Sequence, residues 1–314
     1  MTTAHAAPVG LPIEINRLTK HFGPVMAVKD LTFTVEPGCV TGFLGPNGSG
    51  KTTTLRMLLG LVNPSSGQAT IGGMAYRDIV NPATKVGAVL EATSFHPSRR
   101  ARAHLRTVAR ACGQGDDKVD ASLDLVGLMG DANRRVGGFS LGMRQRLELA
   151  GALIGDPSVL ILDEPSNGLD PQGIAWLRDF MRYLAGEGKT VLVSSHLLSE
   201  MAQTIDRVVI VSHGELRVQG SLEEVTGNLQ TSTMRVRTPE LRRLSEVLTQ
   251  QGITFTELSA DQVTVHQTTP EKLGPVLAQN QIVIYELIHE GSDLESVFLS
   301  LTQGLGFGEQ GATP

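Results

Sequence analysis

The amino-acid sequence predicts an α/β domain with a largely parallel core sheet, followed by a smaller α+β domain. Between residues 13 and 211, short aliphatic runs alternate with helical stretches, as in a sheet that helices cover on both faces. From about residue 229 the order of predicted elements becomes strand, helix, strand, strand, helix, strand. This change of order indicates a second domain.

The larger domain is predicted from aliphatic runs that are too continuous for half-exposed strands. Two earlier segments, IEINRLTK and LTFTVEPG, alternate polar and apolar residues instead, which predicts an antiparallel flank. The buried strands are expected at residues 39–44 (CVTGFL), 159–163 (VLILD), 190–195 (TVLVSS) and 207–212 (RVVIVS).

The smaller domain has the element order of a ferredoxin-like split unit, with one further helix at its end. Strands are expected at residues 233–238, 253–259, 262–267 and 282–288, and helices at 239–252, 269–281 and 293–302. We therefore expect a flexible tail at residues 1–12, the larger domain at 13–228, an accessory domain at 229–304 and a second tail at 305–314.

Composition limits the classes of partner. The 314-residue chain has a net charge of −5 at pH 7, which disfavours non-specific nucleic-acid binding because that needs an excess of Lys and Arg. Its two cysteines, Cys39 and Cys112, are too few for a disulfide framework. No run approaches the roughly 18 apolar residues of a membrane helix, and the N-terminus does not have the pattern of a signal peptide. We expect a cytoplasmic chain that does not itself cross a membrane.

The run GPNGSGKT between a predicted strand and a predicted helix is the pattern of a phosphate-binding loop. Its glycines allow the backbone N–H groups to approach phosphate oxygens closely. Lys51 would place its charge on the β- and γ-phosphates, and the Thr52 hydroxyl suits a Mg²⁺ ligand. The residues expected to contact the nucleotide here are Gly45, Pro46, Asn47, Gly48, Ser49, Gly50, Lys51, Thr52 and Thr53.

Two carboxylates end the aliphatic run VLILDE. The carboxyl end of a buried strand lies in the crevice where open α/β sheets bind ligands. Asp163 would hold Mg²⁺, and Glu164 would orient and polarise the attacking water. The alternative is a surface acidic pair after a core strand, and the phosphate loop favours the functional interpretation.

A capped helix precedes these carboxylates. Ser140 is a natural N-cap for the helix that follows, and Gly142 permits close backbone approach, so the helix start can bind an anion. The simpler interpretation is a capped helix with no ligand.

Five motifs, in order, resemble those of the nucleotide-binding subunits of ATP-binding cassette (ABC) transporters. GPNGSGKT resembles the Walker A loop, FSLGMRQR the signature, LILDE the Walker B strand, NGLD the D-loop and SSH the switch histidine. The match spans residues 13–220. It implies a P-loop NTPase cassette with a mixed core sheet, an antiparallel flank and a helical subdomain.

The resemblance also implies roles for single residues. Phe22 would stack on adenine, Asp170 of the D-loop would contribute to nucleotide binding, and His196 would act in catalysis beside Glu164. From the residues alone, Phe22 could instead be a core aromatic and His196 a hydrogen-bonded core histidine.

The mechanism that the family implies needs two copies of the chain, ATP and Mg²⁺. Two such domains would close head to tail, so that ATP on one chain's phosphate loop is capped by Ser140 and Gly142 of the other. Hydrolysis would reopen them. The pair would energise a separate integral-membrane permease from the inner face of the cell membrane.

The chain departs from the family pattern at two positions. Leu141 replaces one glycine of the signature, and Glu91 stands where the family has the Q-loop glutamine. Glu91 could face Mg²⁺ or its water as part of the catalytic site, or be a plain strand-end carboxylate. With the sequence around it, Glu91 resembles the exporter branch that handles bacitracin-type and lantibiotic peptides, or drugs. The C-terminal part resembles the extension of ABC-2-type bacterial exporter ATPases.

Four arginines, Arg99, Arg102, Arg106 and Arg110, are spaced to form one stripe on a helix. Such a stripe is usually a solvated face, and the alternative is a docking surface for the membrane partner.

Two further functions compete with transport. An ABC-family ATPase acting on nucleic acid or ribosomes would resemble paired cassettes or cassettes with coiled-coil or zinc inserts, which this chain lacks. A small-molecule phosphotransferase is disfavoured by the signature and the D-loop. We therefore expect an ATP-hydrolysing exporter subunit with no nucleic-acid partner.

Overall fold

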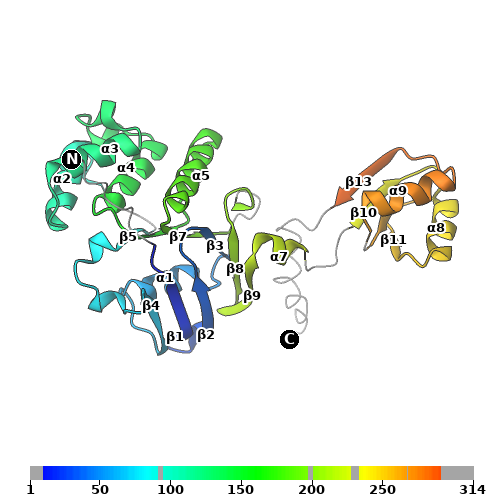
Figure 1. The fold of residues 1–314 in the computed structure, drawn as a ribbon, viewed down its shortest axis with the longest axis horizontal. Helices are drawn as coiled ribbons and strands as arrows, with labels where there is room; N and C mark the ends of the chain where they lie inside the picture. Colours follow the sequence, from blue (N-terminus) through cyan, green and yellow to red (C-terminus); the bar gives the residue numbers. More distant parts are fainter. Residues whose placement is uncertain (1–9, 91–94, 197–200, 228–232, 267, 291–314) are drawn as a thin grey trace, which may run out of the picture. The chain divides into compact units, whose positions relative to one another are not determined.

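The computed structural model describes residues 10–90, 95–196, 201–227, 233–266 and 268–290 (Figure 1). The chain divides into two compact units, residues 1–221 and 222–314. Each unit has its own hydrophobic core, and the two are described separately below.

The first unit is built on a six-stranded sheet in the order β5-β6-β7-β3-β8-β9. Five neighbouring strands are parallel, and β9 runs antiparallel to β8, so the sheet is mixed as expected. Every residue of β3, β6 and β7 is buried, because helices or a second sheet cover both faces. The bounds are β3 Val40–Leu44, β5 Val86–Val89, β6 Val159–Asp163, β7 Thr190–Ser195, β8 Arg207–Ser212 and β9 Glu215–Ser221.

A three-stranded antiparallel sheet, β2-β1-β4, forms the predicted flank. Its strands are β1 Ile13–Phe22, β2 Val25–Val35 and β4 Ser66–Ile71. The helix α1, Lys51–Leu58, belongs to the core between the two sheets, where Leu55 joins the same apolar cluster as Phe33 of β2 and Ile161 of β6. Packing of α1 here fixes the loop that precedes it.

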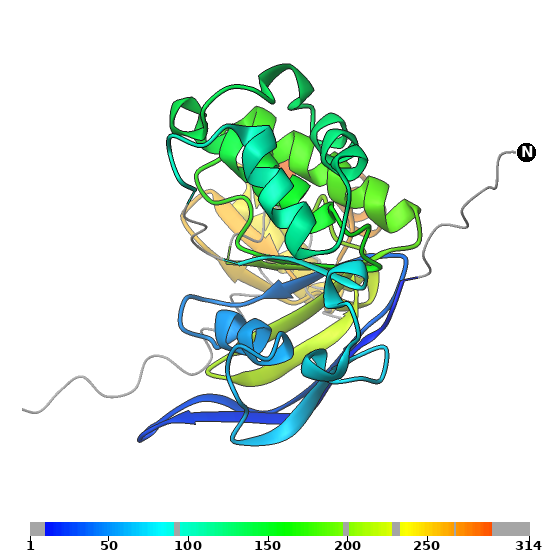
Figure 2. The ribbon, with the colours of Figure 1, turned by 90° about the vertical axis from the view of Figure 1, so that its left-hand side faces the viewer.

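Four longer helices, α2 Ala101–Ala111, α3 Asp116–Leu125, α4 Leu141–Leu153 and α5 Pro171–Gly186, lie on the other side of the six-stranded sheet (Figures 1 and 2). Helices α2, α3 and α4 contact one another, as expected for a helical subdomain. Short 3₁₀ turns occur at Tyr76–Asp78, Pro82–Thr84, Met129–Asp131 and Val136–Gly138.

The predicted arginine stripe is only partly present. Arg99 lies before α2, which begins at Ala101. Arg102 and Arg106 form ion pairs with Asp120 and Asp116 of α3, at 3.0 and 2.8 Å between nitrogen and oxygen. These pairs hold α2 against α3 and leave less free charge for docking a partner.

The second unit begins with α7, Leu222–Gly227, and has the predicted ferredoxin-like order. Its sheet, β11-β12-β10-β13, is antiparallel throughout. The bounds are β10 Thr233–Arg237, α8 Leu241–Gln250, β11 Phe255–Glu257, β12 Gln262–Val265, α9 Pro270–Gln279 and β13 Glu286–Glu290.

One strand of this unit was placed wrongly from the sequence. The aliphatic run at residues 282–288 predicted a strand, but β13 begins only at Glu286. Ile282 packs in the core, while the Val283 N–H donates to Glu240 Oε2 at 2.9 Å and its carbonyl accepts from the Thr238 hydroxyl at 2.6 Å. These side-chain hydrogen bonds replace the sheet ladder. The helix expected at 293–302 lies outside the described residues.

Within the described ranges, no helix is both long and apolar enough to cross a membrane. Cys39 and Cys112 are free, and burial raises the pKa of both thiols, as expected for unreactive cysteines.

Candidate active site

The loop between β3 and α1 needs glycine at several positions. Gly50 has φ +99°, and a Cβ there would lie 2.6 Å from the Ala27 carbonyl oxygen. A Cβ on Gly45 would lie 2.4 Å from the Val211 carbonyl oxygen. Gly48, with φ +79°, is open to solvent. The loop is therefore packed on its inner side and accessible on its outer side, where a phosphate would bind.

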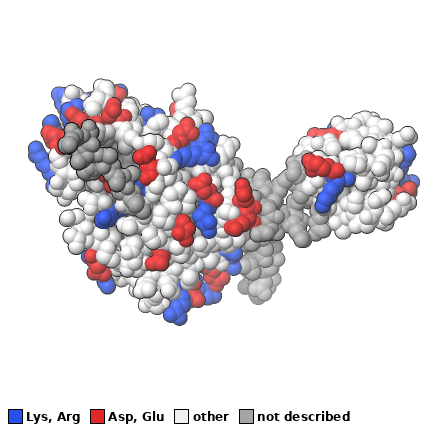
Figure 3. All heavy atoms as spheres, in the orientation of Figure 1, with Lys and Arg blue, Asp and Glu red and all other residues white. Residues whose placement is uncertain are grey.

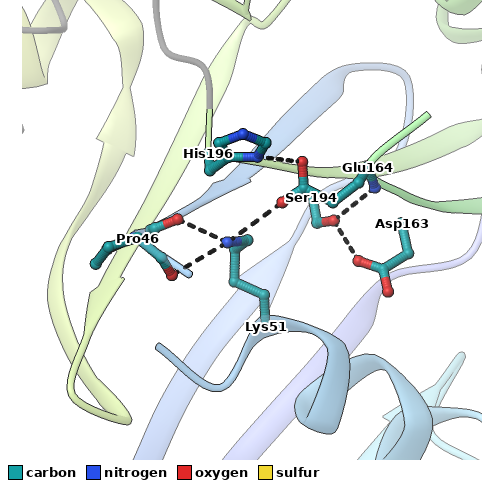
Figure 4. Close-up of polar contacts among 7 residues, drawn as sticks. Pro46, Lys51, Asp163, Glu164, Ser194 and His196 are labelled. Carbon is teal, nitrogen blue, oxygen red and sulfur yellow. Dashed lines mark hydrogen bonds and ion pairs between the residues drawn. The ribbon is translucent and has the colours of Figure 1, made fainter. Parts of the chain in front are cut away.

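Lys51 is held at the centre of the loop with only 6% of its surface exposed. Its Nζ donates to the carbonyl oxygens of Gly45 and Pro46, at 2.6 and 3.3 Å, and lies 3.4 Å from Glu164 Oε1 (Figure 4). A buried ammonium group needs such partners, because burial without them is costly. The cation is thus already placed beside the carboxylate at the end of β6.

Glu164 connects Lys51 to His196. Its second oxygen, Oε2, lies 2.7 Å from Nδ1 of His196, the residue that directly follows β7 (Figure 4). The backbone of Glu164 has φ +50°, a left-handed conformation that is strained for a residue with a side chain. Its N–H donates to Ser194 Oγ at 2.9 Å, and this hydrogen bond helps to hold the strained turn.

Asp163 is the last residue of β6 and is only 4% exposed. The Ser194 hydroxyl donates to its Oδ1, while its Oδ2 is buried without a hydrogen-bond partner. A buried carboxylate oxygen of this kind beside a phosphate loop fits a hard divalent cation such as Mg²⁺. Thr52, the other expected ligand, lines the adjacent cavity.

A cavity of about 350 Å³ brings most of the predicted loop and catalytic residues together. It is lined by Ala27, Asn47, Gly48, Ser49, Gly50, Lys51, Thr52, Thr53, Glu164, Asn167 and His196. Gly45 and Pro46 bound it indirectly, through the carbonyl groups that accept from Lys51. A neighbouring cavity of about 520 Å³ shares Glu164 and Asn167 with it and is also lined by Asp163 and Glu148.

Besides Gly45, Pro46 and Asp163, four more of the predicted site residues that the structure describes do not line the 350 Å³ cavity. Phe22 is 50% exposed, with Lys20 Nζ 5.0 Å from its ring centroid, and so is not a core aromatic. Ser140 caps α4 by accepting from the Met143 N–H at 3.2 Å. Asp170 caps α5 by accepting from the Gly173 N–H at 2.8 Å, and Gly142 lies in the first turn of α4. Glu91 lies outside the described residues.

Two residues of the site were not predicted as such. Ser194 bridges Asp163 and the backbone of Glu164, and a polar residue near the end of an otherwise aliphatic buried strand was the available signal. Asn167 lines both cavities, and its N–H donates to the Glu164 carbonyl at 3.2 Å. Asn167 belongs to the NGLD motif. The motif predicted the position of the D-loop, but it did not predict that Asn167 lies in the site.

Charges of both signs are interspersed over the described part of the face shown in Figure 3. The described residues of that face do not form the kind of continuous basic surface by which proteins bind nucleic-acid backbones.

Comparison with known proteins supports the interpretation of the site. Residues 28–167 match the family described as ABC transporter, and residues 232–295 match a domain of unknown function. The chain is 36% identical over 303 residues to the bacitracin transport ATP-binding protein of Bacillus licheniformis, covering 93% of this chain and 97% of that protein. It is 33% identical over 297 residues to the Nod factor export ATP-binding protein I of Burkholderia lata, with 93% and 97% covered.

A solved structure of an ATP-binding subunit of an ABC transporter aligns with a TM-score of 0.62 at 27% identity, over 69% of this chain and 92% of that one. The predicted cassette fold is therefore confirmed. The order of the motifs, the phosphate loop with its buried lysine, and similarity along nearly the whole chain lead to one conclusion. This chain belongs to the ABC transporter family, as one of its ATP-binding and ATP-hydrolysing subunits.

Proposed function

We propose that the chain powers a separate membrane permease that exports a drug, an antibiotic or a peptide. The observation that carries this proposal is its similarity to the bacitracin and Nod factor proteins, which extends through the second unit as well as the cassette. The chain would act at the cytoplasmic face of the membrane, where ATP and the permease are both within reach.

The geometry supports a mechanism in which Lys51 exchanges partners. When ATP enters, the Lys51 ammonium leaves the carbonyls of Gly45 and Pro46 for the phosphate oxygens, which carry more negative charge. This exchange also separates Lys51 from Glu164. The Glu164 carboxylate is then free to accept a hydrogen bond from the attacking water, and later its proton.

His196 and Ser194 keep Glu164 in place while this happens. His196 Nδ1 holds one carboxylate oxygen, and Ser194 Oγ holds the backbone N–H. Asp163 and Thr52 would hold Mg²⁺, which supplies charge to neutralise the phosphates. The attacking water would be oriented by a Glu164 side chain that is already held in place, so the site needs little reorganisation during the reaction.

The complete nucleotide site would require a second copy of the chain. Ser140 is exposed, and neither it nor Gly142 lines the cavity formed by the phosphate loop of its own chain. Both are free to meet ATP that is bound to a second copy. Closure of the pair on ATP and its opening after hydrolysis would drive the permease.

Affinity purification from membranes tests this function. A tagged wild-type chain, solubilised in mild detergent, should retain a polytopic membrane protein in comparable amount, and the complex should hydrolyse ATP faster than the chain alone. Lys51→Ala is the matched control, since it should keep the partner and lose hydrolysis. Recovery of ribosomal RNA and ribosomal proteins without a membrane protein would contradict the transport function.

A further inference from the structure

The signature residue that departs from the family pattern touches the D-loop of its own chain. Leu141 is the first residue of α4 and is 51% exposed. A Cβ on Gly168 would lie 2.6 Å from Leu141 Cδ2, so the leucine side chain occupies the space directly above that glycine. Gly168 has φ +73°, a backbone conformation that strongly favours glycine.

The contact between the two segments is reciprocal. A Cβ on Gly142 would lie 3.7 Å from Leu169 Cδ2, which is ordinary van der Waals distance. Each segment therefore presents a leucine to a glycine of the other. Leu141 packs over Gly168, and Leu169 packs beside Gly142. Because two contacts join them, the start of α4 and the D-loop are expected to move together.

The D-loop is continuous with the catalytic turn. Its first residue, Asn167, donates its N–H to the Glu164 carbonyl at 3.2 Å, and the Leu169 N–H donates to the Ser166 carbonyl at 3.1 Å. These hydrogen bonds close two successive turns between Glu164 and Leu169. Through these turns, a shift of Gly168 would reach the backbone of Glu164, which is in a left-handed conformation.

We propose that Leu141 is a positioning residue that couples the two nucleotide sites of a dimer. ATP bound by the second copy is contacted by Ser140, the neighbour of Leu141. When α4 shifts in response, the contact between Leu141 and Gly168 moves the D-loop. The D-loop in turn moves Glu164 in the site of the same chain. This inference rests on the proposed shared site and adds to it a direction of coupling within each chain.

The test is steady-state ATP hydrolysis by the full-length chain as a function of ATP concentration. Wild type should be cooperative. Leu141→Gly removes the contact and should lower kcat about fivefold or more and bring the Hill coefficient close to one, with half-saturating ATP changed less than about twofold. Leu141→Met, which can refill the space, should restore both values.

Leu125→Ala is the matched control, because Leu125 is a similarly exposed leucine, 41% accessible, at the end of α3. It should leave kcat and cooperativity unchanged. A thermal unfolding curve for each variant separates a loss of coupling from a loss of folded protein.

The possible outcomes separate the two claims. If Glu164→Gln dimerises with ATP and Leu141→Gly keeps the wild-type kcat and Hill coefficient, Leu141 does not couple the sites, and the shared site stands. If Glu164→Gln stays monomeric with ATP and wild-type hydrolysis is not cooperative, the shared site itself is contradicted, and this inference with it.

Discussion

The two regions of the cassette that are proposed to contact nucleotide are organised in opposite ways. At the phosphate loop, Lys51, Glu164 and His196 are already connected by contacts of 3.4 and 2.7 Å. At the start of α4, Ser140 is exposed and its hydroxyl only caps the helix. The first region holds its charged groups in contact with one another, whereas at the second region the Ser140 side chain makes only the helix cap. This difference supports the proposal that each chain supplies the hydrolytic groups for its own nucleotide and a cap for the nucleotide of a second copy.

The largest expected effect sharpens the first half of this comparison. Glu164→Gln keeps the size of the side chain and removes its ability to accept a proton, so hydrolysis should fall about 100-fold or more while ATP still binds. Hydrolysis of radiolabelled ATP and equilibrium binding of a fluorescent ATP analogue measure the two effects. Wild-type turnover in this variant would exclude Glu164 as the base.

A smaller effect is expected from the residue beneath the catalytic turn. Ser194→Ala leaves the Glu164 N–H and Asp163 Oδ1 without their partner, which should lower the free energy of unfolding by about 1–3 kcal/mol. Urea unfolding followed by fluorescence of Trp176, the only tryptophan, reports on the first unit.

Ser245→Ala serves as the control for this measurement. Ser245 also donates to a carboxylate, Glu257 at 2.8 Å, but it lies in α8 of the second unit. The same unfolding transition should not shift in that variant. Equal stability of Ser194→Ala and wild type would mean that Ser194 does not support the catalytic turn.

The smallest effect concerns the 520 Å³ cavity beside the catalytic carboxylates. Burial raises the pKa of Glu148 to about 7, from an ordinary value of 4.5. Since the folded-state pKa is the higher one, the contribution of Glu148 to stability is complete below about pH 4.5 and is lost as the pH rises to 7.

Glu148→Gln cannot ionise and should therefore avoid this loss. It should be more stable than wild type by about 1–2 kcal/mol at pH 8, a figure reduced for the partial exposure of the side chain. Near pH 4.5 the two proteins should be equally stable. The Trp176 unfolding assay at both pH values measures this, and an identical difference at both would show that ionisation of Glu148 is not its cause.

Most of the sheet and most of the residues that line the phosphate-loop cavity could be predicted from sequence because the signals are local. Aliphatic runs fix β3, β6, β7 and β8, and the loop pattern fixes the residues around Lys51. Long-range hydrogen bonds could not be predicted. The bonds from Thr238 and Glu240 keep Val283 out of a strand despite its aliphatic neighbours, and Ser194 gains its role only when β7 pairs with β6.

The arginines of α2 show the same limit. The sequence shows the spacing of the arginines along one helix. It does not show that Arg102 and Arg106 pair with aspartates of α3, because those ion pairs form only when the two helices pack together.

Complementation between two inactive variants tests the shared site most directly. Lys51→Ala damages the phosphate loop, and Ser140→Ala damages the cap, so each pure variant should hydrolyse little ATP. In a mixed dimer, the intact loop of one chain meets the intact cap of the other, so one complete site forms. Random pairing makes half of the dimers mixed, so hydrolysis should recover to at most about a quarter of the wild-type rate, and to less than that if the two sites are coupled. Mixed dimers that form, as shown by differential tags, and remain inactive would contradict the account.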